Sequence, residues 1–311
     1  MRVLFLCPPV GNYPAWKAAL AEQAPNVEIV QNDYAGPKDA IDVAIVLSPP
    51  PGFLKQFSNL KAVFSLGAGA EHLWSDPELP NLPLVRLTYS DKRRSMSEWI
   101  LYAVLHFHRE FDRCARAQRR AEWERIDHSP LAPQRRVGVL GLGDLGAAAA
   151  LELRAWDFAV SGWSRRQKNL SGVDCFSGRE GLFRMLPDVN ILVGLLPLTP
   201  DTKGILNADV FTRLPRGAAV VNAGRGGNLV TNDLVGALDS GHLSGAFLDV
   251  TDPEPLPTGD PLWSHPKITI TPHIASYPPP QATVRSFIDM LHMVERGKVS
   301  ELPLVDRDAG Y

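Results

Sequence analysis

The most constraining feature of this sequence is a glycine-rich loop between an apolar run and an alanine-rich segment. The apolar run, residues 136–140, predicts a β-strand, and residues 147–156 predict a helix. The loop between them reads Gly141-Leu-Gly143-Asp-Leu-Gly146. In that context the first glycine makes a tight turn, the second admits a pyrophosphate, and the third packs helix against strand. We therefore predict dinucleotide binding at Gly141, Gly143, Asp144, Leu145 and Gly146.

Short apolar runs alternate with helical patterns along the rest of the chain. Most of the runs are continuous rather than alternating, which is typical of strands covered on both faces of a parallel sheet. The first series is expected at residues 3–7, 27–30, 43–47, 62–66 and 84–87. The second series is expected at residues 137–140, 158–163, 191–196, 218–221, 246–250 and 268–270. These series predict an α/β protein with two parallel-sheet domains, Rossmann-like or flavodoxin-like.

The domain boundaries follow from the two series and from the helical patterns between and after them. Residues 1–95 are expected to form the first part of a substrate-binding domain, and residues 96–276 a nucleotide-binding domain. A single long helix is expected over residues 97–123, and its mixed-charge second half could form a solvated arm or clasp a second subunit. Residues 277–311 carry an amphipathic helix that is expected to return to the first domain, which leaves an interdomain cleft.

Composition excludes several classes of function for the 311-residue chain. The net charge of −2 argues against nucleic-acid binding, since a phosphate backbone is bound mainly by excess Lys and Arg. Three widely spaced cysteines do not make a disulfide framework, and no apolar stretch is long enough to span a membrane. We therefore expect a cytoplasmic protein with no membrane or nucleic-acid partner and no metal site.

The residues after the second strand of the nucleotide-binding pattern bear on cofactor choice. An enzyme that uses NAD places Asp or Glu there, on the ribose 2′-hydroxyl. This chain has Ser164, followed by Arg165 and Arg166. A hydroxyl and two guanidinium groups suit a 2′-phosphate, which a carboxylate would repel. The pattern favours NADP(H) over NAD(H), although two arginines in a loop are also common as solvated surface residues.

Three polar side chains follow three later strands of the second series. They are Arg225 in VNAGRGG, Glu254 in DVTDPEPLP and His273 in TPHIAS. Taken singly, each has an ordinary structural explanation, such as a surface ion pair, a solvated turn or a satisfied imidazole. Because ligands of α/β sheets bind beyond the carboxyl ends of strands, together they indicate an acid–base site. An Arg fork in such a site matches a substrate carboxylate.

These motifs identify a family that the chain resembles. Together with LGAGAEHL from Leu66 and LLPLTPDTKGILN from Leu195, they are similar to the D-isomer-specific 2-hydroxyacid dehydrogenases, above all the NADPH-dependent glyoxylate/hydroxypyruvate reductases. The resemblance implies that Arg225, Glu254 and His273 are catalytic. It also implies hydride transfer from NADPH to a small 2-oxo acid, with His273 as general acid, to give the D-2-hydroxy acid.

Further contacts are carried over from the same resemblance. Substrate binding is implied for Ala68, Gly69, Arg225 and His273, and a homodimer is expected. Cofactor binding is implied for Leu196, Pro197, Thr202, Ala223, Gly224, Asp249 and Ser276. Two other functions stay open: a reductase of a bulkier, aromatic 2-oxo acid, and a non-enzymatic nucleotide-sensing protein on the same fold.

Overall fold

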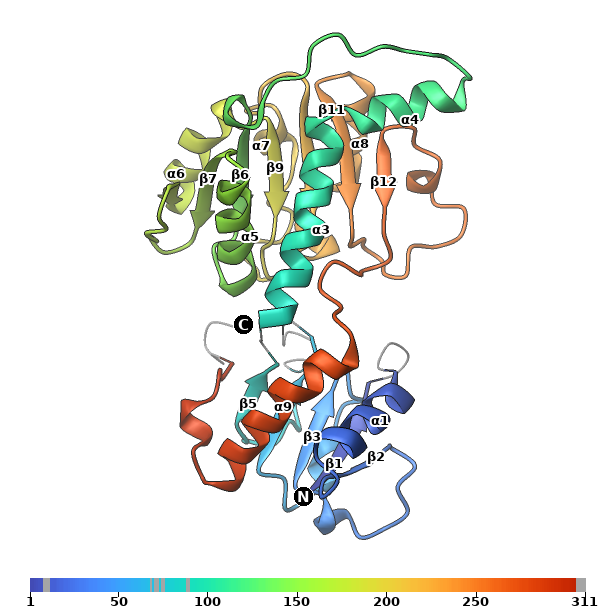
Figure 1. Ribbon diagram of the computed structural model, residues 1–311, viewed down its shortest axis with the longest axis vertical. Coiled ribbons are helices and arrows are strands. Elements are labelled where there is room, and N and C mark those ends of the chain that lie inside the picture. The colour runs from blue at the N-terminus through green and yellow to red at the C-terminus, as the bar shows by residue number, and fades with distance from the viewer. Residues whose placement is uncertain (8–11, 68, 70–72, 74–75, 88–89, 306–311) are drawn as a thin grey trace. The chain divides into compact units, whose positions relative to one another are not determined.

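The computed structural model describes residues 1–7, 12–67, 69, 73, 76–87 and 90–305 (Figure 1). The chain divides into two compact units. The first joins Met1–Lys92 to Pro278–Tyr311, and the second is Arg93–Tyr277. The expected boundaries, after residues 95 and 276, differ from these by three residues and one residue. The roles assigned to the two domains, and the cleft between them, stay predictions.

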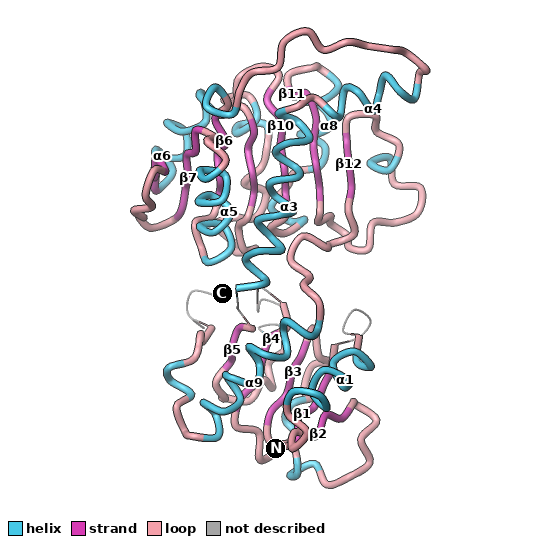
Figure 2. Tube along the Cα trace, viewed as in Figure 1, coloured by secondary structure: helices cyan, strands magenta, loops and turns pink. Residues whose placement is uncertain are grey.

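The first unit is built on a five-stranded parallel sheet with the strand order β2-β1-β3-β4-β5 (Figure 2). Its strands are β1 (Arg2–Leu6), β2 (Glu28–Val30), β3 (Val43–Val46), β4 (Ala62–Ser65) and β5 (Leu84–Arg86). Helices α1 (Tyr13–Gln23) and α9 (Pro280–Glu295) cover one face, although they are far apart in sequence. The ring centroids of Trp16 on α1 and Phe287 on α9 lie 6.1 Å apart. This strand order is that of the flavodoxin-like folds.

The second unit is built on a seven-stranded parallel sheet with the strand order β12-β11-β10-β9-β6-β7-β8. Its strands are β6 (Arg136–Leu140), β7 (Ala159–Ser164), β8 (Val173–Ser177), β9 (Ile191–Gly194), β10 (Ala218–Asn222), β11 (Leu243–Leu248) and β12 (Ile268–Ile270). Its helices are α3 (Ser90–His108, which begins in the first unit), α4 (Phe111–Arg119), α5 (Asp144–Ala155), α6 (Gly178–Met185), α7 (Ala208–Phe211) and α8 (Thr231–Asp239). The order reverses between β6 and β9, which is the switch point of a Rossmann fold.

The two faces of the second sheet have separate cores. Apolar residues of α3 and α5 pack on one face, and those of α6, α7 and α8 pack on the other. Because successive strand residues point to opposite faces, a strand covered on both faces needs an unbroken apolar run. The predicted fold class, two parallel-sheet α/β domains, is confirmed.

Two elements differ from the expectation. The strand β8 was not predicted, because at the sheet edge only Val173 among its five residues is buried. The single long helix expected over residues 97–123 is wrong: α3 ends at His108, and α4 begins at Phe111. Between them Glu110 adopts a left-handed backbone conformation with φ of 56°, and such a residue cannot continue a helix.

Within the part of the chain that the structure describes, no helix is both long and apolar enough to cross a membrane.

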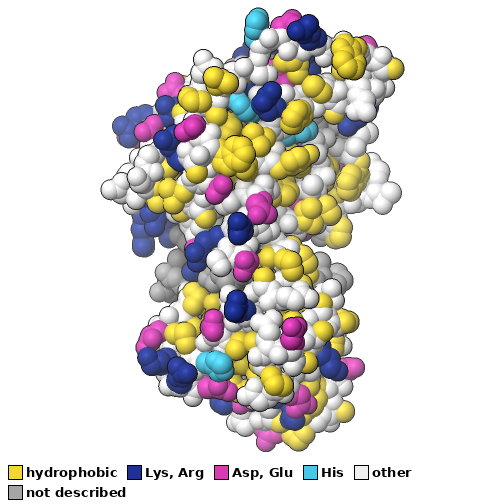
Figure 3. Space-filling model, in the orientation of Figure 1, with side chains coloured by type: hydrophobic (Ala, Val, Ile, Leu, Met, Phe, Trp, Pro, Cys, Tyr) yellow, Lys and Arg dark blue, Asp and Glu magenta, His cyan; other side chains and the backbone are white. Residues whose placement is uncertain are grey.

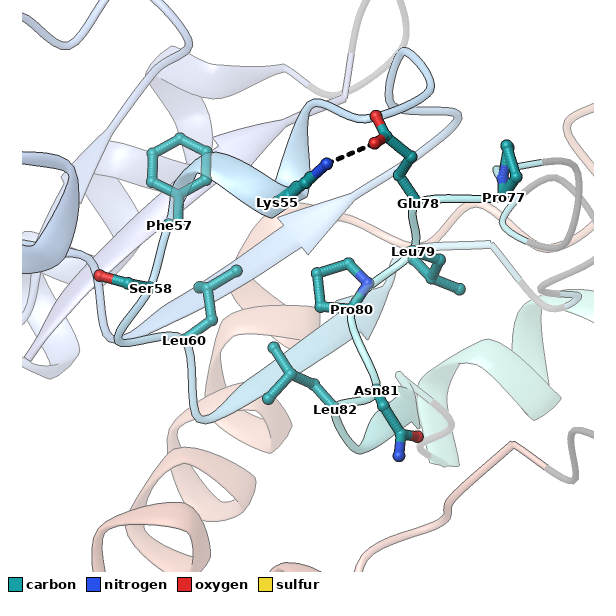
Figure 4. Close-up of a pocket in the computed structure, with 10 residues that line it drawn as sticks. All are labelled: Lys55, Phe57, Ser58, Leu60, Pro77, Glu78, Leu79, Pro80, Asn81 and Leu82. Atoms are coloured by element: carbon teal, nitrogen blue, oxygen red, sulfur yellow. Dashed lines mark hydrogen bonds and ion pairs between the residues drawn. The ribbon is translucent and has the colours of Figure 1, made fainter.

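The first unit has a shallow pocket of about 470 Å³ (Figure 4). Its lining includes Leu60 and Leu82 on the segments that lead into β4 and β5, so it lies at the amino ends of these strands. Lys55 and Glu78 form an ion pair beside it. Since ligands of α/β sheets bind at the carboxyl ends of strands, we do not assign a ligand to this pocket.

Candidate functional site

The glycine loop after β6 has the shape that a dinucleotide requires. Gly143 caps the amino end of α5, and its carbonyl accepts the N–H of Ala147. A Cβ on Gly146 would lie 1.7 Å from the carbonyl oxygen of Gly141, so only glycine allows helix and loop to approach this closely. A Cβ on Gly143 would meet nothing within 4 Å. The loop thus presents open space beside the first N–H groups of α5, which have no partner within the helix and suit a phosphate.

The loop after β7 places the two predicted arginines in solvent. Ser164 is buried at the end of β7, and its hydroxyl donates to the carbonyl of Arg166 at 2.7 Å. Arg165 and Arg166 are exposed. Figure 3 shows Lys and Arg side chains gathered beside α6 and this loop. No acidic residue stands at the end of β7, so the loop gives a 2′-phosphate a positive surface.

The loop after β10 holds Arg225 through two buried asparagines. Asn222 donates from Nδ2 to the carbonyl of Arg225 at 3.0 Å, and Asn228 accepts the N–H of Arg225 at 3.0 Å. A Cβ on Gly226 would lie 2.0 Å from the carbonyl oxygen of Thr251, so this loop touches the one after β11. The backbone of Arg225 is therefore fixed beside the segment that carries Glu254.

Glu254 and His273 are in direct contact. Nδ1 of His273 lies 2.5 Å from Oε1 of Glu254, and the two side chains are 48% and 41% exposed. This bond occupies Nδ1 and leaves Nε2 for proton exchange with a ligand. His273 has a φ of 55°, in the left-handed region that non-glycine residues rarely adopt. Such strain persists only where the surrounding structure imposes it.

Asp249 imposes that conformation from the end of β11. Its carboxylate accepts three bonds: from the hydroxyl of Thr271 at 2.6 Å and from the N–H groups of Ile274 and Ala275, each at 2.9 Å. Its carbonyl accepts the N–H of His273 at 2.9 Å. Asp249 is only 2% exposed. The sequence prediction assigned this residue to cofactor binding; the bonds give it a structural part that the prediction missed.

The remaining predicted cofactor residues lie on the same edge of the second sheet. Leu196 and Ala223 are buried, and Pro197 is half-buried. The hydroxyl of Thr202 donates to the carbonyl of Pro197 at 2.6 Å and accepts the N–H of Thr199 at 2.8 Å, so it shapes its own loop. Gly224 is buried and Ser276 is half-buried. Their contacts with a cofactor stay predictions.

Of the four predicted substrate residues, Gly69 belongs to the first unit and follows β4, whereas Arg225 and His273 belong to the second unit. Ala68 lies outside the described residues. Gly69 is buried, and its carbonyl accepts the hydroxyl of Ser65 at 3.1 Å. The sequence prediction missed Lys92, which is 4% exposed and donates from Nζ to the carbonyl of Leu66 at 2.8 Å. A buried ammonium group beside this turn adds positive charge where a substrate carboxylate is expected.

Comparison with known proteins bears on this arrangement. Residues 101–275 match the family model of the D-isomer specific 2-hydroxyacid dehydrogenase NAD binding domain. A D-isomer specific 2-hydroxyacid dehydrogenase from Xanthobacter autotrophicus Py2, solved with NADPH and MES, is 40% identical, with a TM-score of 0.93 over 100% of this chain and 99% of that one. The chain belongs to the D-isomer-specific 2-hydroxyacid dehydrogenase family.

Two further solved members resemble this dehydrogenase over its whole length. An NADPH-dependent glyoxylate/hydroxypyruvate reductase from Sinorhizobium meliloti, in complex with NADP and sulfate, is 35% identical with a TM-score of 0.89, over 100% of this chain and 99% of that one. A probable 2-hydroxyacid dehydrogenase from Rhizobium etli CFN 42, with NADP, HEPES and L(+)-tartaric acid, is 33% identical with a TM-score of 0.88, at the same coverage. The protein is thus an oxidoreductase, and the glycine loop lies within the residues that match the NAD binding domain model.

The hydrogen bonds to Asp249 predict that replacing this residue lowers the stability of the protein. Asp249→Ala leaves the N–H groups of Ile274 and Ala275 without their charged acceptor, and that of Ala275 is buried, so we expect the free energy of unfolding to fall by about 2–3 kcal/mol. Urea denaturation measures this change. Thr271→Val, which removes one of the three bonds, is the matched control and should cost about 1 kcal/mol. An Asp249→Ala protein that unfolds at the wild-type urea concentration would contradict the assignment.

Proposed function

We propose that this dehydrogenase uses NADPH to reduce a small 2-oxo acid of the glyoxylate or hydroxypyruvate type to its D-2-hydroxy acid. The observation that carries the proposal is the 2.5 Å contact between Nδ1 of His273 and Oε1 of Glu254. A carboxylate at that distance fixes the orientation of the ring and leaves Nε2 to donate a proton to a ligand. When bound, NADPH supplies the hydride that reduces C2 of the acid.

The chain's own residues have distinct parts in this reaction. Nε2 of His273 donates the proton that the forming alkoxide takes up, and Glu254 orients the ring and balances its charge. Arg225 binds the substrate carboxylate and polarises the carbonyl, so it stabilises the charge that develops in the transition state. The turn after β4, with Gly69 and the Lys92 ammonium, is assigned to the carboxylate as well.

Preference for NADPH over NADH rests on the loop after β7. Exposed guanidinium groups at Arg165 and Arg166 follow a serine where an acid would mark an NAD enzyme. The solved relatives from X. autotrophicus, S. meliloti and R. etli contain NADPH or NADP, which supports the same choice.

A homodimer formed through the second unit is part of the proposal. Large apolar side chains are exposed on α3, on α4 and on the segment after it: Tyr102 (57%), Phe111 (53%), Trp123 (99%) and Leu131 (73%). Figure 1 shows α4 and this segment running along one end of the unit. Large apolar side chains exposed on consecutive segments favour a surface that another protein covers.

The choice of substrate is tested by the loss of nicotinamide absorbance with glyoxylate, hydroxypyruvate and phenylpyruvate. We expect turnover with the two small acids. Faster turnover of phenylpyruvate would favour a reductase of aromatic acids, and tight NADPH binding without any turnover would favour a nucleotide-sensing protein.

His273→Asn tests the acid–base role in the same assay. Asparagine tolerates a positive φ, so the loop is preserved while the proton donor is lost. We expect kcat to fall by about 10²–10⁴-fold, the usual contribution of a general acid. The dissociation constant for NADPH, measured by fluorescence titration, should stay unchanged; an equal loss of NADPH binding would show that His273 serves the cofactor instead.

Replacing both arginines after β7 by alanine tests the cofactor preference. Each charge-assisted bond to a 2′-phosphate contributes about 1.5–3 kcal/mol, so we expect the NADPH dissociation constant to rise by at least about 10-fold. NADH lacks the phosphate and is the internal control. Equal weakening of both cofactors would rule out a role in recognising the 2′-phosphate.

The dimer is tested by light scattering on the wild type and on Tyr102→Glu with Trp123→Glu. Two buried carboxylates would oppose association, so we expect the variant to have the mass of one chain. Leu304→Glu, which changes an exposed apolar residue of the first unit, should keep the wild-type mass. A monomeric wild-type protein would overturn this part of the proposal.

A further inference from the structure

An ion pair connects the glycine loop to helix α3. Nε of Arg93, on α3, lies 3.0 Å from Oδ1 and 3.2 Å from Oδ2 of Asp144, the first residue of α5. The side chains are 44% and 43% exposed, and both belong to the second unit. The terminal nitrogens of Arg93 make no bond to any residue within the described ranges, so they remain able to donate to a ligand.

The carboxylate of Asp144 suits the amino end of a helix but opposes the binding of a pyrophosphate there. The amino end of a helix attracts anions through its free N–H groups and its dipole, and the glycine loop brings a pyrophosphate there. A carboxylate on the first residue of α5 benefits from the same field and repels a second anion. Without compensation, Asp144 would therefore weaken binding of the cofactor.

We propose that Arg93 and Asp144 form a charge pair that sets the affinity of this loop for the cofactor pyrophosphate. The guanidinium of Arg93 neutralises the carboxylate, so that Asp144 no longer repels the pyrophosphate. Arg93 thus acts on cofactor affinity from outside the glycine loop, by balancing the charge of Asp144. This inference rests on the proposed binding of NADPH at the loop.

The first turns of α3 are anchored in a way that suits this part. Ser95, two residues after Arg93, donates its hydroxyl to the carbonyl of Ala275 at 3.3 Å. Ala275 in turn donates its N–H to Asp249. Arg93 therefore extends from a turn that is tied to the loop of His273, and less conformational entropy is lost when it pairs with Asp144.

Arg94 provides a matched control one residue away. It pairs with Glu98 on the same helix at 3.4 Å, and its side chain is 79% exposed. Removing its charge changes the net charge of the protein by the same amount as removing that of Arg93. A difference between the two variants therefore reports position rather than net charge.

The test is a double-mutant cycle on cofactor affinity. The dissociation constants of NADPH and NADH are measured by fluorescence titration for the wild type, Arg93→Gln, Asp144→Asn, the double variant and Arg94→Gln. Since Arg93→Gln leaves an unbalanced carboxylate beside the phosphates, we expect both constants to rise by about 5–20-fold at low salt, and less at high salt. Asp144→Asn should leave them unchanged or lower, and the double variant should lie within about 3-fold of the wild type.

The outcomes separate this inference from the proposed function. Arg93→Gln must affect NADPH and NADH alike, because both carry the pyrophosphate, whereas the Arg165 and Arg166 variants affect NADPH alone. Adenosine 2′-monophosphate, which has no pyrophosphate, should compete with NADPH equally well in the wild type and Arg93→Gln. An effect of Arg93→Gln no larger than that of Arg94→Gln, or a loss of affinity in Asp144→Asn as large as in Arg93→Gln, would overturn the charge-pair inference.

Discussion

Parallel pairing of every strand in the second sheet determines where this protein can place reactive groups. In a parallel sheet all the carboxyl ends lie along one edge, so the loops after β6, β7, β10, β11 and β12 emerge there together. They carry the glycine loop, the two arginines after β7, and the residues Arg225, Glu254 and His273. A shift of one strand by a single residue would turn its side chains to the opposite face and break this convergence.

That constraint explains which parts of the site the sequence predicts. A strand followed by a polar residue is visible in the sequence, so Arg225, Glu254 and His273 could be assigned to one edge, and the contact between the last two follows. The network of Asp249 could not be foreseen, because two of the donors to its carboxylate are backbone N–H groups that every sequence contains. The pair of Arg93 and Asp144 joins residues that are 51 positions apart on two helices, and no local pattern signals it.

The errors in the predicted fold have equally local causes. The edge strand β8 has a single buried residue, so it lacks the apolar run by which buried strands are found. The break after α3 falls at Glu110, where neither glycine nor proline marks a helix end. There the chain leaves the helix while the apolar pattern continues to Phe111, so tertiary context rather than local propensity ends the helix.

The loops of Arg225 and His273 share one feature: buried hydrogen bonds hold the backbone rigid while the side chain stays freer. Asn222 and Asn228 fix the backbone of Arg225, and Asp249 fixes that of His273; these three residues are at most 2% exposed. A buried polar group is costly unless it is fully bonded, so each network is satisfied in few loop conformations. The side chains of Arg225 and His273 can then stay partly in solvent without loss of positional accuracy. In this arrangement the strain at His273 is offset by the bonds of Asp249, so the contact between His273 and Glu254 is preorganised.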